Sequence, residues 1–163
     1  MLNFVLFAIL QGNIFAGGGA GFGTGFTNTS ANFAPSVSIH AFPFPIKNIG
    51  IFNSLEWDNR YFNLDPFKID VKDKTFVTGF TFRILKPKFQ PSFRVGLMNF
   101  SEKIDVTFYD ELFVSGNVRK NALFLGTGAY VKLWKKIYLD PEVSIAVSGR
   151  PPWRIAARVG WFF

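Results

Sequence analysis

The last eleven residues of the chain carry the pattern that most restricts its fold. Residues 153–163 read WRIAARVGWFF, and neighbouring residues differ sharply in character. Because the side chains of a β-strand alternate between two faces, one face of this segment is aromatic and aliphatic, with a tryptophan near each end. The other face carries Arg154, Arg158 and mostly small residues. Such a strand fits between hydrocarbon on one side and a narrow polar interior on the other.

The same alternation recurs in other segments, which are separated by prolines, glycines and charged residues. We therefore predict seven further strands, at residues 17–27, 36–42, 49–57, 75–85, 91–99, 121–133 and 137–148. The connections after the second, fourth and sixth strands are short. Those after the first, third and fifth are longer, and include a polar connection at 58–74. This parity predicts short turns and both termini on one side of a membrane, with long loops on the other.

These strands predict an all-β fold. We expect one eight-stranded antiparallel up-and-down β-barrel that spans a membrane and closes by pairing its first strand with its last. The predicted strands are about as long as tilted membrane strands, which need roughly 9–11 residues. The glycines of the first strand would face inwards and leave room for Arg154 and Arg158.

The aromatic end of the sequence adds a second signal, carried by Trp161 and Phe163. In this respect the chain resembles bacterial outer-membrane β-barrels, whose closing strand commonly ends in Phe as an assembly signal. The resemblance is strongest to the small eight-stranded OmpX-like and OmpA-like barrels. It implies a location in the outer membrane of a Gram-negative bacterium, insertion by the barrel-assembly machinery, and contact with outer-membrane lipid and lipopolysaccharide. It also implies that Trp161 and Phe163 act in assembly.

Residues 1–16 are predicted to be a signal peptide, and residues 17–163 the barrel domain. Residues 4–10 form a short apolar core, and Ala16 is a small residue at which cleavage could occur. The segment departs from the usual signal pattern because no Lys or Arg precedes the core. A first strand or a buried helix is the alternative interpretation. The chain has no Cys, which excludes disulfides and a lipidated cysteine.

The charge balance, with 18 Lys and Arg against 11 Asp and Glu, is basic. Nucleic acid is not a predicted partner, because the basic residues are scattered and form no recognisable binding motif. Anionic membrane lipids account better for the charge. The polar strand faces hold Gly, Ser, Ala and Thr, and nearly all lysines lie in connections or at strand ends. This favours a membrane barrel over the alternative of a soluble lipid-carrying barrel, whose polar face would meet water.

The inward faces also carry ionic side chains, which need partners because an unpaired buried charge is costly. We predict an interior charge network made of Glu56, Arg83, Arg94, Asp140, Glu142, Arg154 and Arg158. An eight-stranded barrel is just wide enough for its own side chains to fill. The network is therefore expected to plug the barrel and keep it closed to solutes.

His40 is the only histidine, and it shares a predicted strand face with Ser36 and Ser38. A Ser/His hydrolase is therefore conceivable. Because some small outer-membrane barrels act on lipid A, the resemblance implies a lipid A-modifying outer-membrane enzyme as an alternative function. No G-x-S-x-G motif is present, and nothing in the sequence fixes an acid beside His40. We predict a non-enzymatic protein with no catalytic residue, no cofactor and no metal site.

The longest predicted connection, 100–120, keeps a strand-like alternation of its own at Ile104, Val106 and Phe108. Turns are possible at 110–111 and at 116–117. We predict that the fifth and sixth strands continue past the membrane as a projecting hairpin, which exposes Leu112, Phe113 and Val114. These six apolar residues are the candidate partner-binding loop. The predicted function is that of a scaffold, adhesion or complex-subunit protein acting through its outer loops.

Overall fold

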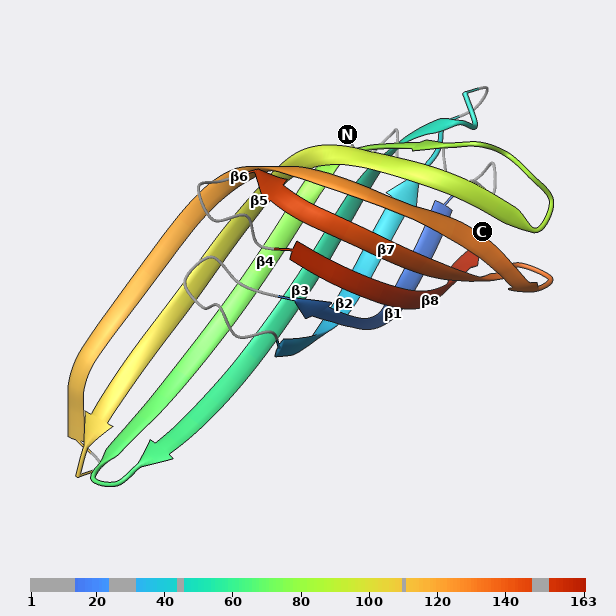
Figure 1. The fold of residues 1–163 in the computed structure, drawn as a ribbon. Helices are drawn as coiled ribbons and strands as arrows, with labels where there is room; N and C mark the ends of the chain where they lie inside the picture. The colour runs from blue at the N-terminus through green and yellow to red at the C-terminus, as the bar shows by residue number, and fades with distance from the viewer. Residues whose placement is uncertain (1–13, 24–31, 44–45, 110, 148–152) are drawn as a thin grey trace.

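The computed structural model describes residues 14–23, 32–43, 46–109, 111–147 and 153–163. Its strands form one closed antiparallel barrel in which each strand pairs with the next and β1 pairs with β8 (Figure 1). The predicted fold is thereby confirmed. The strands are β1 (Ile14–Gly23), β2 (Asn32–Ala41), β3 (Ile49–Leu64), β4 (Phe67–Arg83), β5 (Phe89–Phe108), β6 (Glu111–Trp134), β7 (Ile137–Val147) and β8 (Trp153–Phe162).

Strand β1 begins at Ile14, three residues before the predicted start of the barrel domain. Phe15 is buried and pairs with His40 on one side and with Phe162 on the other. A cleavage after Ala16 would thus cut through β1. Residues 1–13 of the predicted signal peptide lie outside the described residues, and the cleavage site stays a prediction.

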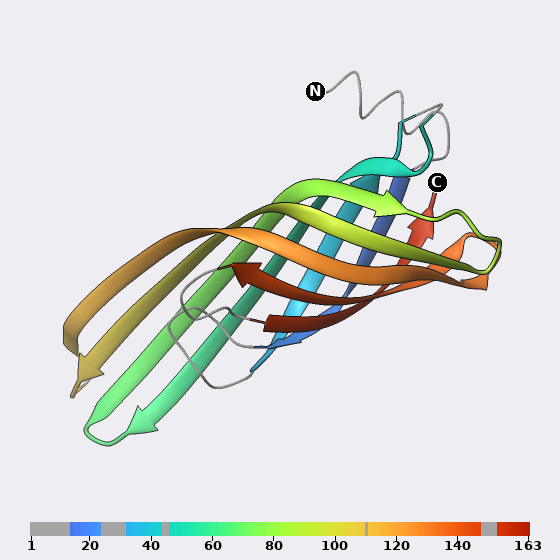
Figure 2. The same cartoon turned by 45° about the horizontal axis from the view of Figure 1, so that its top comes forward.

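Four neighbouring strands extend far beyond the other four (Figures 1 and 2). Strands β3, β4, β5 and β6 have 16, 17, 20 and 24 residues, whereas β1, β2, β7 and β8 have 10, 10, 11 and 10. We call residues 57–74, 101–109 and 111–119, which form this four-stranded sheet, the extension. We call the opposite end of the barrel, where Ile14 and Phe163 lie, the terminal rim.

The predicted projection of the fifth and sixth strands is confirmed, because their pairing continues from Phe100↔Lys120 to Phe108↔Glu111. The prediction of a turn at 116–117 is wrong, since Gly116 lies inside β6 and pairs with Ile104 of β5. The predicted polar connection at 58–74 is also wrong. It is a second hairpin, paired from Trp57↔Lys74 to Leu64↔Phe67. Its many charges suggested a loop, but they alternate with apolar residues as in a strand.

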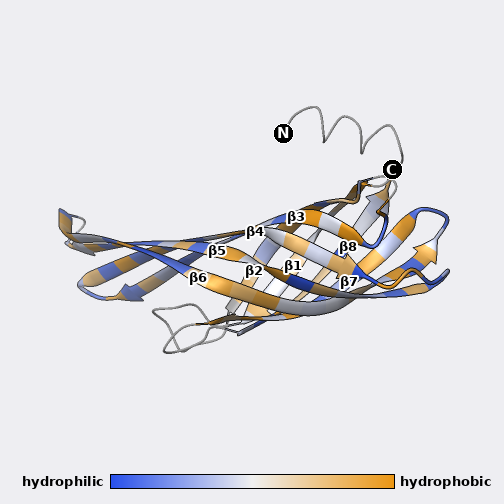
Figure 3. Cartoon of the chain, turned by 90° about the horizontal axis from the view of Figure 1, so that it is seen from above, coloured by the Kyte–Doolittle hydropathy of each residue, from blue (hydrophilic) through white to orange (hydrophobic). Residues whose placement is uncertain are grey.

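Burial alternates along the barrel strands as the sequence predicts. In β8, for example, Trp153, Ile155 and Val159 are exposed while Arg154 and Arg158 are buried. The exposed side chains of the barrel strands are thus mostly apolar, and the buried ones include the charged residues, the reverse of a water-soluble barrel that carries lipid inside. In Figure 3, hydrophobic and hydrophilic bands alternate along the strands. No helix in the described part of the chain is long and apolar enough to cross a membrane.

Close packing explains the glycines at the seam between β1 and β8. A Cβ atom added at Gly19 would lie 2.0 Å from the carbonyl oxygen of Ala157, and one at Gly23 would lie 2.1 Å from that of Trp153. Gly19 pairs with Arg158 and Gly23 with Arg154. The glycines therefore leave space beside the two arginines, which the alternation predicts.

Candidate functional site

The barrel interior holds a connected ion-pair network across its width. Arg94 on β5 pairs with Asp140 and Glu142 on β7. Arg158 on β8 lies 3.5 Å from Asp140, 3.3 Å from Glu142 and 3.4 Å from Glu56 of β3. Arg154 completes the network by pairing with Glu56. Three arginines thus meet three carboxylates, so that the buried group is electrically neutral.

Arg83 is the predicted network residue that the structure does not bring into this group. Its Nε donates to the carbonyl oxygen of Lys47 at 2.8 Å, and its Nη1 donates to Oε1 of Gln90 at 3.3 Å. Its guanidinium also lies 3.5 Å from the centre of the Phe42 ring. Arg83 sits at the terminal rim, one inward position beyond Thr81, which pairs with Arg94. There it reaches backbone and aromatic partners instead of the carboxylates.

His40 is buried inside the barrel, where its Nδ1 hydrogen-bonds with the Tyr130 hydroxyl. The rings of Phe15 and Phe52 pack against it at 5.3 and 5.8 Å. Ser36 instead accepts a hydrogen bond from Nε of Arg158 at 2.6 Å, and no hydrogen bond joins the Ser38 hydroxyl to another described group. The structure therefore gives His40 aromatic surroundings and no serine partner within the described residues. No group of three His, Asp or Glu side chains among them is arranged to hold a metal ion.

The proposed assembly residues lie at the terminal rim with their side chains outward. Trp161 and Phe163 are both exposed on the apolar surface. The backbone N–H of Phe163 donates to the carbonyl oxygen of Ile14 at 2.9 Å. This bond extends the pairing of β1 and β8 to the end of the described chain. Their role in assembly stays a prediction.

The extension carries apolar side chains on the face that continues the barrel interior. The pairing aligns Phe62, Ile69, Val106 and Val114 in one row across its four strands. A neighbouring row on the same face contains Arg60, Val71, Ile104 and Gly116. Several of these side chains are open to solvent: Phe62 is 45% exposed, Leu64 61% and Val114 51%. We call this surface the inner face of the extension.

The opposite surface, the outer face of the extension, is polar. One row across it holds Asn59, Lys72, Lys103 and Asn117, and the next holds Tyr61, Asp70, Asp105 and Ser115. Lys72 lies 2.8 Å from Asp70, and Lys103 lies 2.7 Å from Asp105. Ser115 also donates to Asp105 at 2.6 Å. The outer face is thus a solvated, ion-paired surface.

An acidic cluster separates the inner face from the barrel interior. Asp58, Asp73 and Glu102 lie side by side on β3, β4 and β5, and all three pair with Arg60. Burial raises the pKa of Asp73 to about 6, helped by the nearby Glu102 and opposed by Arg60. One arginine therefore pairs with three carboxyl groups, and burial weakens the acidity of Asp73.

The structure brings the six predicted partner-binding residues to the free end of the extension. Ile104 and Val106 lie half-buried on the inner face. The Phe108 ring, at the tip, packs with those of Phe67, Tyr109 and Phe113. Sequence reasoning missed the contribution of the other hairpin. Its signal was the alternation of Phe62 and Leu64 before the turn, and of Phe67, Ile69 and Val71 after it.

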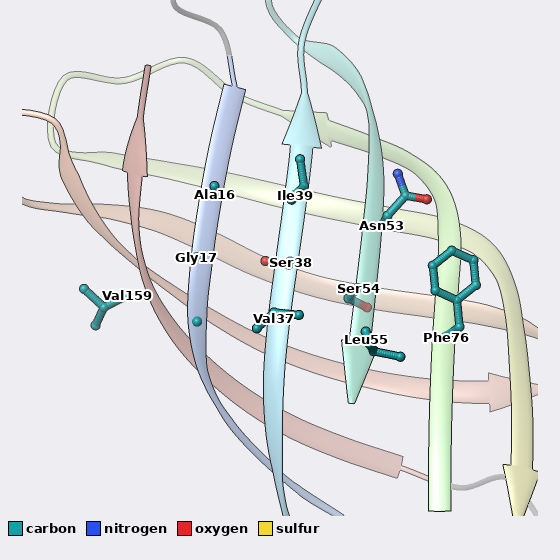
Figure 4. Close-up of a pocket in the computed structure, with 11 residues that line it drawn as sticks. Ala16, Gly17, Val37, Ser38, Ile39, Asn53, Ser54, Leu55, Phe76 and Val159 are labelled. Carbon is teal, nitrogen blue, oxygen red and sulfur yellow. The ribbon is translucent and has the colours of Figure 1, made fainter. Parts of the chain in front are cut away.

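A shallow hollow of about 560 Å³ lies on the outward surface over β1, β2 and β3 (Figure 4). Gly17 and Gly18 line it from β1, and Val37, Ile39 and Leu55 line it from β2 and β3. Asn53 and Phe76 lie side by side at the edge of the hollow (Figure 4). The hollow belongs to the apolar belt that faces lipid, where acyl chains can fill it.

No protein-family model matches the sequence, and no curated protein sequence matches it significantly. Solved structures do match. The chain superposes on Ail, the attachment invasion locus protein of Yersinia pestis, with a TM-score of 0.62 and 14% identity over 92% of this chain and 96% of Ail. The fold is that of the eight-stranded outer-membrane barrels.

Two further structures support the same assignment. The match to Neisserial surface protein A has a TM-score of 0.63 and 13% identity, and covers 92% of this chain and 96% of that one. The N-terminal barrel domain of Pseudomonas aeruginosa OprF matches with a TM-score of 0.62 and 14% identity, over 93% and 98%. At these identities the likeness establishes the fold alone. Function has to be argued from the residues of this chain.

Proposed function

We propose that this protein is a non-enzymatic interaction protein of the bacterial outer membrane, which holds a partner on the inner face of its extension. The observation that carries the proposal is the exposed apolar sheet formed by β3–β6 outside the barrel. Monomeric soluble surfaces rarely leave large contiguous apolar patches open to water, and such patches mark interaction sites. On this topology the extension lies outside the cell.

The open edges of the extension support the same proposal. Pairing of β3 with β2 ends at Ser36↔Glu56, and pairing of β6 with β7 ends at Leu123↔Val147. Beyond these points both outer strands continue for several residues without a described neighbour. Unpaired strand edges present backbone donors and acceptors to another chain. A partner can therefore gain both apolar contacts and backbone hydrogen bonds.

The barrel itself is proposed to be an anchor. Its neutral ion-pair network and the ring cluster of Phe15, Phe42 and Tyr130 occupy the interior. We therefore propose that it conducts no solutes and catalyses no reaction. Outer-membrane lipid, lipopolysaccharide and the barrel-assembly machinery are its proposed membrane partners.

Ail provides a limited parallel. It is an attachment invasion locus protein, and one of its structures holds the heparin analogue sucrose octasulfate. This shows that a barrel of this fold can engage a ligand. For the present chain we propose attachment through the apolar inner face, because the lysines Lys72 and Lys103 of the outer face are already paired with aspartates.

The proposal can be tested by photo-crosslinking on intact cells. A photoreactive phenylalanine at Phe62, on the inner face, should give discrete adducts with the bound partner. The same group at Asn59, on the outer face of the same strand, is the matched control and should give few. Replacing residues 104–118 with a short Gly/Ser linker should abolish the Phe62 adducts while leaving membrane insertion intact. Adducts that survive this replacement, or that form equally from Asn59, would exclude the inner face as the binding surface.

A further inference from the structure

We infer that two copies of this chain pair side by side in one membrane, through the outward surface around Asn53 on β3. This surface is separate from the inner face of the extension, and its pairing does not depend on the partner bound there. The outward face of a barrel strand in lipid is expected to be apolar. The outward residues of β3 in the membrane are Ile49, Ile51, Asn53, Leu55 and Trp57. One amide therefore interrupts a lipid-facing strand.

Asn53 lies near the middle of the bilayer. It stands four residues from Ile49, beside the terminal rim, and four residues from Trp57, where the extension begins. This leaves roughly 13 Å of strand on either side at the rise of a β-strand. Its neighbours across the sheet are Ile39 on β2 and Thr78 on β4. The amide is therefore far from the lipid head groups and from the water at both membrane surfaces.

No hydrogen bond joins the Asn53 amide to another group in the described part of the chain. An amide without a partner in hydrocarbon is costly, because the donors and acceptors that water would supply are missing. The middle of an acyl chain carries neither a donor nor an acceptor, so lipid cannot replace them. In membrane proteins such side chains hydrogen-bond to polar groups of a neighbouring segment. The Asn53 amide therefore needs a neighbour that also places a polar group at mid-depth.

A second copy meets this requirement by symmetry. Two chains inserted in the same direction can be related by a two-fold axis along the membrane normal, which keeps every residue at the same depth in both. When the axis passes beside Asn53, the two amides face each other. Each amide has N–H donors and a carbonyl acceptor, so the pair can form two reciprocal hydrogen bonds. Any other partner would have to supply a polar group at the same depth.

The surroundings of Asn53 are compatible with such a pair. The two-fold axis places β4 of each copy opposite β2 and β1 of the other. No like charges meet there, because the outward neighbours of the amide are uncharged: they are Ile39, Ile51, Leu55, Phe76 and Thr78. The contact is therefore apolar around one central pair of amides.

The hollow over β1, β2 and β3 has a matching side chain across the axis. At a strand tilt of about 40° and a strand spacing of about 4.8 Å, Phe80 on β4 lies roughly 8 Å to one side of Asn53 over the barrel surface. The middle of the hollow, between Ile39 and Gly18, lies roughly 8 Å to the other side at nearly the same height. The Phe80 side chain, which is 55% exposed in the single chain, therefore stands opposite the hollow of the second copy.

Gly18 supplies an independent observation. It lies between Ala16 and Ala20 on the outward face of β1, so this face has only small side chains there. A Cβ atom added at Gly18 would come no closer than 4.0 Å to its neighbours, so the packing of the single chain does not require glycine. Glycine inside a strand often marks a close approach of another chain or a ligand, and small residues line the interfaces of membrane segments. In the proposed pair they leave room for Phe80.

Other polar side chains on the outward face of these strands have a partner or lie near water. Thr127 donates to a backbone carbonyl oxygen of β5 at 3.4 Å. Asn99 and Asn121 lie opposite each other on β5 and β6, next to the extension. Thr78 lies opposite Asn53 and belongs to the same proposed surface. The deep polar positions therefore point to the surface around Asn53 and not to the far wall of the barrel.

The chain contains no Cys, which allows a direct test by disulfide trapping. The Asn53→Cys protein is oxidised with copper phenanthroline in isolated outer membranes, where all copies are inserted in the same direction. The two thiols meet at the axis, so a cross-linked dimer should form. Val143→Cys is the matched control, because Val143 is also outward and exposed but lies on β7, on the opposite wall. It should give roughly tenfold less dimer, since its thiols point away from the axis.

Energy transfer between labelled copies in lipid vesicles measures self-association without the thiols. Asn53→Leu removes the amide pair and Gly18→Leu fills the hollow, and each should raise the dissociation constant by about tenfold or more. Val143→Leu should leave it unchanged. Heat-modifiable migration of each variant verifies that the barrel has folded.

Three results would each overturn the inference: equal trapping through Val143, self-association that survives both Asn53→Leu and Gly18→Leu, or a monomer at every ratio of lipid to protein. A monomer that retains a lipid in native mass spectrometry, and loses it in Gly18→Leu, would assign the hollow to lipid and overturn it as well. None of these variants alters the inner face of the extension. Photo-crosslinking from Phe62 therefore tests the proposed function separately.

Discussion

The extension continues four of the barrel's eight strands, but the two regions place their apolar residues on opposite faces. Strand β5 shows this within one element. Within the barrel, Phe93 and Leu97 point outwards and Arg94 points inwards. In the extension, Asp105 points outwards and Val106 points inwards. Inward and outward residues alternate in the same way along the whole strand, so the exchange of the apolar and polar faces reflects a change in the surroundings. The outer surface passes from lipid to water, as membrane barrels require.

The difference also explains why the partner proposed for the inner face would bind the extension and not the barrel interior. Inside the barrel, buried charges are enclosed by eight strands and satisfied by one another. On the inner face of the extension, the four strands lie behind the apolar side chains, and no described element covers their other side. Burying such a face gains roughly 25 cal/mol per Å² of apolar surface removed from water. The extension therefore retains a driving force for association that the barrel has already used.

The largest expected effect comes from removing an arginine in each region. Arg94→Ala leaves Asp140 and Glu142 buried without their main cation and should reduce the free energy of unfolding by about 3–5 kcal/mol. Arg60→Ala, in the extension, should cost less, about 1–3 kcal/mol, because its side chain is 16% exposed to water, whereas that of Arg94 is fully buried. Urea unfolding in lipid vesicles measures both. Equal losses would show that the two regions do not differ in enclosure.

A second comparison uses one phenylalanine from each region. Phe15 is fully buried among His40, Tyr130 and Phe162, so Phe15→Ala should destabilise the barrel by about 3–5 kcal/mol. Phe62→Ala should cost under about 1.5 kcal/mol, since its ring already meets solvent. The same unfolding measurement applies. A small loss for Phe15→Ala would indicate that the barrel closes without residues 14–16.

Acidification should stabilise the extension around Asp73. The pKa of Asp73 is raised to about 6, so the folded state binds a proton more tightly than the unfolded chain does. The resulting stability is present below about pH 4 and is lost as the pH rises through about 6. Hydrogen exchange in the extension, corrected for its intrinsic rate, should therefore slow when the pH falls from 7 to 5. Asp73→Asn should remove this dependence; a carboxyl titration midpoint for Asp73 near 4 would contradict it.

The smallest effect on stability is expected at the terminal rim. Deleting Phe163 removes one backbone hydrogen bond to Ile14 and an exposed side chain, which should cost about 1 kcal/mol in purified protein. Its larger consequence should be in cells, where the inserted amount falls several-fold if Phe163 is an assembly signal. Quantifying the protein in isolated outer membranes tests this. Unchanged insertion would leave Phe163 with a local structural role only.

Sequence reasoning predicted the barrel because alternation is a direct consequence of strand geometry. It also predicted which face each barrel residue occupies, since Arg94, Arg154 and Arg158 all point inwards. It did not predict the height of each residue along the barrel. Arg83 has the correct face but stands at the rim, out of reach of the carboxylates. Height depends on the pairing register, which alternation leaves undetermined.

Only one of the two hairpins of the extension was predicted, because the charges of the other hid its alternation. The charges at Lys68, Asp70 and Lys72 made this segment look like a polar loop, although Ile69 and Val71 alternate with them. A charged strand is stable there because its polar face meets water. The contact between His40 and Tyr130 could not be predicted from the sequence, because barrel closure brings together residues that are 90 positions apart.

The unbroken ladder between barrel and extension has a mechanical consequence. The pairing of β3 with β4 runs without interruption from Ile49↔Phe82 at one end to Leu64↔Phe67 at the other. Antiparallel hydrogen bonds lie perpendicular to the strands, so a pull along the strand axis stresses every rung together in shear. A sideways pull opens them one after another. A partner strand paired along the edge of β6, as proposed, would therefore resist a pull along the strand axis and would yield to a sideways pull.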